Sequence, residues 1–175
     1  MKYKDLHSLL EEQGKKWLLY KHDLVNNILE LRTTLIKLID APEGGWQAPN
    51  SNEMGRYIDV AVPVDGSPSL NFSNVQDCPQ EDGCLFFLFK IGLTKAEGVF
   101  PIRYFQKKIA IKYKDNVALF STSDPENISN GNWSSDKEKI SNEIVKLLAE
   151  YLSYDPFNGP QLKNAIGFGF HSERK

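Results

Sequence analysis

A run of basic and aromatic side chains between Glu97 and Asp115 has the composition of a nucleic-acid contact. It holds five bases and no acid. Lysine and arginine contact phosphates and release counterions, and aromatic rings can stack on exposed bases. The candidate DNA-binding residues are Arg103, Lys107, Lys108, Lys112 and Lys114. The alternative interpretation is a solvated sheet face whose lysines discourage edge-to-edge aggregation.

The net charge of −2 conceals this basic segment. Residues 41–97 carry three bases and eight acids, whereas residues 98–122 carry five bases and one acid. A local basic surface influences the choice of partner more than the net charge does. We therefore expect double-stranded DNA as the partner. The acidic block 41–97 favours the alternative, a basic protein partner.

Motifs for catalysis are poorly represented. No serine lies in a Gly-x-Ser-x-Gly elbow, and neither Cys78 nor Cys84 has a histidine nearby in the sequence. We predict no catalytic residue, no metal and no cofactor, and we do not expect an enzyme. A divergent metal-dependent nuclease is an alternative, in which Asp82 would act with residues 106–108. Gln106 weakens it, because an amide attracts Mg²⁺ less than a carboxylate does.

The composition is typical of one globular domain over residues 1–175, with 41% hydrophobic and 25% charged residues. No apolar run is long enough to span a bilayer, and the first residues lack the apolar core of a signal peptide. A cytoplasmic location is expected. Cys78 and Cys84 are expected to be free thiols, because the cytosol is reducing.

The first forty residues repeat apolar side chains at three- and four-residue steps, which is the period of a helix. From Leu24 onward a second apolar row widens the stripe. A continuous helix here would be far longer than a compact domain of this size. We therefore predict a break at Gly14, with helix packing on a sheet as the main interpretation. The alternative is a dimerisation seam in a homodimer.

The rest of the chain predicts an α+β fold, with an antiparallel or mixed β core of about 5–6 strands over residues 56–121. Strands are expected at 56–64, 84–93, 99–105, 107–114 and 117–121, with 41–55 and 65–83 as loops. Asp115 and Asn116 form the expected hairpin turn. One helix follows at 135–153, capped by Ser134 or Ser135 with Glu138 in a capping box. Residues 160–175 are expected to form a last strand or an arm.

A basic face then follows from strand alternation. Ile109, Ile111 and Tyr113 are expected on one face of the hairpin, and Lys108, Lys112 and Lys114 on the other. The lysines would thus form one continuous row.

Four segments of apolar and turn residues are distinctive: GVFPIRYF (98–105), KIAIKYKDNVALFSTSD (108–124), the Trp133-Ser134-Ser135 triplet and the helix ending at Leu152. Together they resemble the N-terminal DNA-recognition domain of McrB-type modification-dependent restriction proteins. The resemblance covers residues 98–152 and implies a binding domain that positions a separate motor or nuclease on DNA. In a fold of that kind, Tyr104, Phe105 or Trp46 would line a pocket for an extruded base. Burial in the core is the alternative for each.

The expected function is therefore a DNA-binding module, the specificity domain of a restriction or antiviral phage-defence system. It would contact duplex DNA through the basic aromatic hairpin. The first alternative is a small protein-binding inhibitor of the immunity type, or an adaptor. The second is the metal-dependent nuclease.

Overall fold

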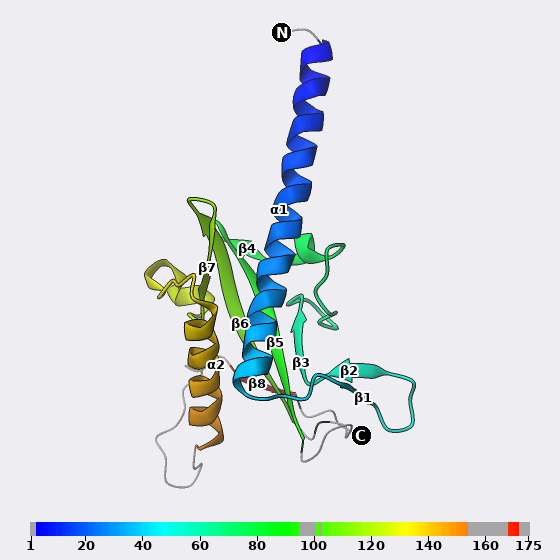
Figure 1. Cartoon of the computed structure of the whole chain (residues 1–175), viewed down its shortest axis with the longest axis vertical. Helices are drawn as coiled ribbons and strands as arrows, with labels where there is room; N and C mark the ends of the chain where they lie inside the picture. Colours follow the sequence, from blue (N-terminus) through cyan, green and yellow to red (C-terminus); the bar gives the residue numbers. More distant parts are fainter. Residues whose placement is uncertain (1–2, 95–100, 102, 154–167, 172–175) are drawn as a thin grey trace.

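A computed structural model describes residues 3–94, 101, 103–153 and 168–171 of the chain. Their elements form an α+β fold, in which the helix α1 (Tyr3–Leu38) precedes antiparallel sheets and the helix α2 (Lys137–Leu152) follows them (Figure 1). The lower half of α1 lies against the sheet and beside α2, and its upper half projects beyond both. The α+β class expected from the sequence is confirmed.

The main sheet has six strands, all paired antiparallel. Its order is β3 (Ile58–Ala61), β5 (Cys84–Leu93), β6 (Arg103–Lys114) and β7 (Val117–Ser121). The short β4 (Gln80–Glu81) also pairs with β5, and β8 (Phe168–His171) pairs with β6. Asp115 and Asn116 join β6 to β7 with φ of 51° and 61°, as a tight hairpin requires.

One face of this sheet, the helical face, packs under α1 and α2. The apolar run of β5 follows from its central place, since it is buried along nearly its whole length. Alternate residues of β5, β6 and β7 contribute to the core from the sheet, and the buried stripes of both helices close it. The largest of these buried side chains include Phe87, Phe89, Phe105, Phe120, Leu24, Ile28, Leu31, Leu35, Ile91 and Ile109.

The opposite face, the back face, carries a smaller apolar cluster. Cys84, Phe86 and Ala110 of the sheet meet Ile128, with Trp133 packed against them. Ile128 belongs to the 3-10 helix η2 (Pro125–Asn130). The other 3-10 helix, η1 (Val75–Asp77), supplies Val75 to the core on the helical face.

The segment 41–55, expected to be a loop, contains a small two-stranded sheet. Its strands are β1 (Gly45–Gln47) and β2 (Met54–Arg56), paired antiparallel. Trp46 packs against Gly55 of the paired strand, where an added Cβ would come within 2.1 Å of the indole ring. These two strands were not predicted, because an alternating pattern cannot be recognised in only three residues.

The predicted break at Gly14 is wrong, because α1 is continuous over 36 residues. At 1.5 Å per residue it is about 54 Å long. A break would be needed only if the whole helix lay within the body of the fold. Instead the buried residues of α1 begin at Leu24, and the part before it projects (Figure 1).

Other boundaries shift for local reasons. The strand expected at 56–64 is the shorter β3, and the strands expected at 99–105 and 107–114 include one continuous strand, β6. Asp136, rather than Ser134 or Ser135, caps α2 by accepting from the backbone N–H groups of Glu138 and Lys139. Glu138 is therefore the second helical residue, and the capping box does not form. The segment 160–175, expected to form a last strand or an arm, contains the strand β8, whereas residues 154–167 and 172–175 lie outside the described residues.

Candidate nucleic-acid interface

Three lysines of β6 lie on the back face of the sheet and define the lysine row: Lys108, Lys112 and Lys114. Lys108 and Lys114 are exposed, and Lys112 is half-buried. Ile109 and Ile111 point the other way, into the core under the helices. The predicted separation of the two faces of this strand is confirmed.

An aromatic ring borders the lysine row. The Nζ of Lys112 lies 3.8 Å from the centroid of the Trp133 ring, which is within cation–π range. Trp133 packs on the apolar cluster of the back face, and this packing fixes the position of its ring. The back face thus combines ammonium groups with a fixed indole.

Lys107 does not belong to this row. It pairs with Phe89 across the sheet on the helical face and is 2% exposed. Its Nζ lies 2.9 Å from Oδ1 of Asp124. The side chain is neutralised and enclosed, so in this conformation it has no access to a phosphate.

Arg103 is the first residue of β6, and its backbone pairs with Leu93. Its side chain lies outside the described part of the chain. The structure thus brings together Lys108, Lys112 and Lys114 of the five predicted bases and separates Lys107 from them.

The aromatic candidates for base stacking occupy two different places. Phe105 is fully buried and meets Tyr151 of α2 edge-on, with ring centroids 5.4 Å apart. Trp46 is buried against Gly55, and its ring centroid lies 5.9 Å from that of the half-buried Tyr104. Phe105 and Trp46 are therefore buried, which is the alternative that the sequence left open for each of them. No open ring face is available at either residue in this conformation.

Lys90 is a further basic residue of the same face and was not among the predicted DNA-binding residues. Leu88 pairs with Lys108, and Lys90 pairs with Gln106, so Lys90 and Lys108 are diagonal neighbours on the back face. Its Nζ donates to the backbone oxygen of Ser67 at 3.1 Å. The sequence does indicate the position of Lys90, because alternation within the strand at 84–93 places it on the same side as Leu88 and Phe86.

The nuclease arrangement is not assembled. Asp82 precedes the start of β5, whereas Gln106, Lys107 and Lys108 pair with the distal residues 88–90. Four residues separate Cys84 from Leu88, a distance of about 14 Å along a strand. Within the described ranges, no three side chains of histidine, cysteine, aspartate or glutamate lie together as metal ligands would.

Both cysteines are buried free thiols, as expected. Burial, and to a lesser degree the charge of Asp77, raises the pKa of Cys78 to about 12. Burial also raises the pKa of Cys84, against the opposing effect of the nearby Lys112 ammonium. A protonated, enclosed thiol is a weak nucleophile.

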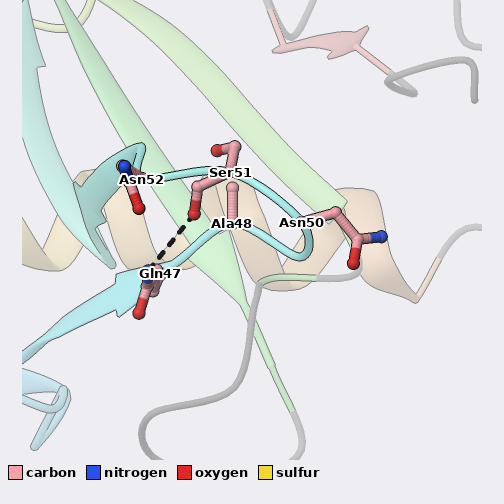
Figure 2. A pocket seen from close by; sticks show the side chains of 5 residues that line it. All are labelled: Gln47, Ala48, Asn50, Ser51 and Asn52. Carbon is pink, nitrogen blue, oxygen red and sulfur yellow. Dashed lines mark hydrogen bonds between the residues drawn. The ribbon is translucent and has the colours of Figure 1, made fainter.

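A shallow polar hollow lies at the tip of the β1–β2 hairpin, lined by Gln47, Ala48, Asn50, Ser51 and Asn52 (Figure 2). The Nε2 of Gln47 donates to the backbone oxygen of Ser51 at 3.2 Å and closes the loop. Its lining holds amide and hydroxyl groups and no charge. These groups bind many polar ligands, so the hollow alone assigns no chemistry.

Compared with family models, curated proteins and solved structures, the chain matches none of them. Among the described helices, none combines the length and the apolar content needed to cross a bilayer.

Proposed function

We propose that the chain is a DNA-binding module that contacts the duplex through the lysine row. The observation that carries this proposal is the projection of Lys108, Lys112 and Lys114 from one face of a single strand, beside the fixed ring of Trp133. Lys108 lies where β6 pairs with β5, and beyond Ile111 the strands β6 and β7 continue as a two-stranded ribbon that carries Lys112 and Lys114. A ribbon of two strands is an element that the major groove admits. Lysines spaced along it would contact successive phosphates.

The context we propose is a restriction or phage-defence system in which this module supplies DNA specificity. The resemblance of residues 98–152 to the DNA-recognition domain of McrB-type proteins supports it. The lysine row falls inside the resembling segment. A separate motor or nuclease would then act on the DNA that this chain positions.

Binding to a duplex oligonucleotide, measured by fluorescence anisotropy at several salt concentrations, tests the proposal. Each lost phosphate contact lowers the slope of log K against log salt by about 0.9. We expect the triple variant Lys108→Ala, Lys112→Ala, Lys114→Ala to lower the slope by as much as about 2.7. The matched control removes three exposed lysines from the helices, through Lys37→Ala, Lys139→Ala and Lys146→Ala.

The two triple variants have the same net charge, so a general electrostatic effect would change both alike. The proposal is wrong if the wild-type chain fails to bind duplex at about 50 mM salt, or if both variants bind equally well. Absence of DNA binding together with a stable complex with a basic protein would support the inhibitor or adaptor alternative instead.

A further inference from the structure

The first half of α1 presents large apolar side chains to solvent. Over residues 3–20, named here the free half of α1, eight such side chains are exposed: Tyr3, Leu6, Leu9, Leu10, Trp17, Leu18, Leu19 and Tyr20. A contiguous apolar surface of this kind marks an interaction site. The helix has no buried residue before Leu24.

Part of this surface is a regular stripe. Tyr3, Leu6, Leu10, Gln13, Trp17 and Tyr20 follow each other at alternating steps of three and four residues, which aligns them on one side of the helix. We name this set the free stripe. At its foot the rings of Trp17 and Tyr20 meet edge-on at 5.4 Å, and Tyr20 leans on Tyr113 at 5.4 Å.

A hollow lies directly beside the foot of the free stripe. It has a volume of about 410 Å³ and lies between α1 and the segment that contains η1 and β4. Trp17, Tyr20 and Leu24 line it from the helix, and Val75 and Leu85 line it from the sheet side. It can therefore receive an apolar side chain that arrives along the helix.

We propose that the free stripe pairs with the free stripe of a second copy of this chain, with the two helices antiparallel. With residue i opposite residue 23 − i, Tyr3 of one copy faces Tyr20 of the other, Leu6 faces Trp17, and Leu10 faces Gln13. This register matches positions a and d of an antiparallel pair in every layer. The tip of each helix then reaches the hollow at the foot of the other.

Charge favours this direction over a parallel one. In a parallel pair, residues five apart flank the seam, so Lys16 of each copy would face Lys21 of the other. Like charges in that position are destabilising. In the antiparallel register, Lys16 lies beside Leu9 of the second copy, over which its aliphatic stem can pack.

The available area suits a small stable interface. Such interfaces bury roughly 600–800 Å² per partner. Tyr3 and Trp17 are 83% and 52% exposed, and aromatic side chains bury about 150–250 Å² each. Leu6 and Leu10, 51% and 67% exposed, and the walls of the hollow add to this area.

Sedimentation equilibrium of the full chain tests whether the pair forms. We expect a species of twice the 19.9 kDa chain mass. Leu10→Glu, at the centre of the free stripe, is expected to shift the chain to monomer and weaken association at least tenfold. Leu19→Glu is the matched control, because Leu19 is equally exposed but lies off the stripe. A wild-type monomer at all concentrations, or a dimer that Leu10→Glu leaves intact, overturns the proposal.

Spin labels test the direction of the pair, with Cys78 and Cys84 left buried. At 1.5 Å per residue, labels on Lys4→Cys are offset along the axis by about 22 Å between copies, and labels on Glu11→Cys by about 2 Å. We therefore expect a long distance from the first variant and a short one from the second. Equal short distances from both would indicate a parallel pair and overturn the antiparallel assignment. A monomer that instead sediments with lipid vesicles would assign the stripe to a membrane surface.

Discussion

Lys107 and Asp124 form an ion pair at 2.9 Å between Nζ and Oδ1, with the lysine side chain 3% exposed and the aspartate 29% exposed. Lys107 sits on β6 among core residues of the helical face, and Asp124 follows β7. An enclosed ammonium is costly without its counter-charge. The ion pair therefore holds the segment that follows β7 against β6 in the sheet.

Removing one partner of this pair is expected to cost more than replacing the other by an apolar residue. Asp124→Ala leaves the buried ammonium unpaired and should lower the free energy of unfolding by about 3 kcal/mol, the lower end for buried pairs because Asp124 is partly exposed. Lys107→Met replaces the lysine by an apolar residue of similar length and should cost less than about 1 kcal/mol. Urea unfolding monitored by tryptophan fluorescence measures both. Equal losses would mean that the side chain of Lys107, rather than its charge, is what the core requires.

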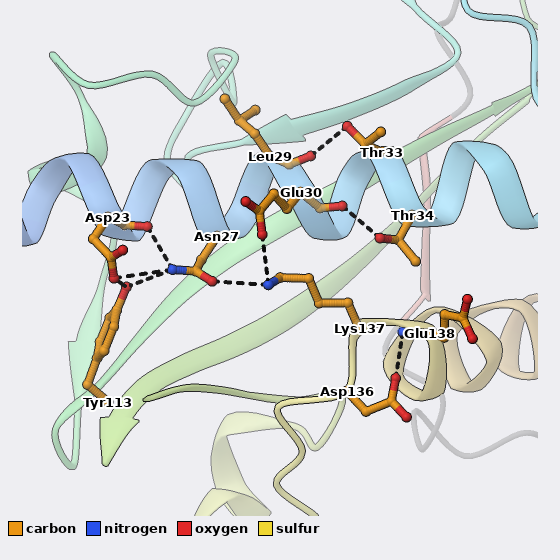
Figure 3. A network of polar contacts seen from close by, with 10 residues as sticks. All are labelled: Asp23, Asn27, Leu29, Glu30, Thr33, Thr34, Tyr113, Asp136, Lys137 and Glu138. Atoms are coloured by element: carbon orange, nitrogen blue, oxygen red, sulfur yellow. Dashed lines mark hydrogen bonds and ion pairs between the residues drawn. The ribbon is translucent and has the colours of Figure 1, made fainter. Parts of the chain in front are cut away.

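A polar network joins α1, the hairpin turn region and the start of α2 (Figure 3). Tyr113 donates its hydroxyl to Oδ2 of Asp23 at 2.5 Å, and Asn27 donates to Oη of Tyr113 at 3.3 Å. Lys137 of α2 donates to Oδ1 of Asn27 at 3.1 Å and pairs with Glu30 at 2.9 Å. These contacts link α1, β6 and α2, which are distant in the sequence.

The ionisation of Tyr113 is expected to make stability fall at high pH. Burial, and then donation to the Asp23 carboxylate, raises the pKa of Tyr113 well above its ordinary value. Because the folded pKa is raised, the stabilisation is complete below the unfolded value of about 10 and is lost as the pH rises toward the folded value. Wild type should therefore lose free energy of unfolding above about pH 10, and Tyr113→Phe should lose less. The comparison is made in the Leu10→Glu background, in which pairing between copies is removed. Tyr3→Phe, at a position exposed in the single chain, is the control and should follow its parent.

Much of the fold was predictable because its signals are local. Alternation along β6 separated Ile109 and Ile111 from Lys108 and Lys112, and the run of β5 identified a central strand. The pairing of Lys107 with Asp124 was not predictable, because it joins residues 17 apart whose proximity depends on the path of the chain after β7. Five bases in the sequence therefore suggested a larger surface patch than the fold provides.

The projecting half of α1 shows a different limit. The stripe before Leu24 has the same period as the stripe after it, yet one half is exposed and the other is core. Periodicity records which face of a helix is apolar and not what covers it. Only the position of the sheet separates the two halves.

Ser141 offers a test of the core under α2. The residue is fully buried, and its hydroxyl has no hydrogen-bond partner among the described residues. A buried hydroxyl without a partner costs desolvation energy, and alanine is the better helix former. Ser141→Ala should raise the free energy of unfolding by about 1 kcal/mol in thermal or urea unfolding. A loss of stability would reveal a hydrogen bond at this site, and Ser135→Ala, at an exposed position, should change little.

Gly14 limits the helicity of the free half of α1. A Cβ added at Gly14 meets nothing within 4 Å, so alanine fits without strain. Glycine in a helix interior costs about 1 kcal/mol relative to alanine. The free half depends on intrinsic propensity, because its side chains are mostly exposed to solvent. Its amides should exchange hydrogen faster than those from Leu24 onward.

Gly14→Ala should therefore slow hydrogen exchange in residues 3–20 about fivefold, the factor that corresponds to about 1 kcal/mol. The comparison is made in the Leu10→Glu background, so that pairing between copies does not contribute protection. Lys15→Ala is the matched control, because lysine and alanine differ little in helix propensity. Exchange around Leu24, Ile28 and Leu31 should stay unchanged, since those residues are held by the core. Equal slowing along all of α1 would instead mean that the helix opens as one unit with the sheet.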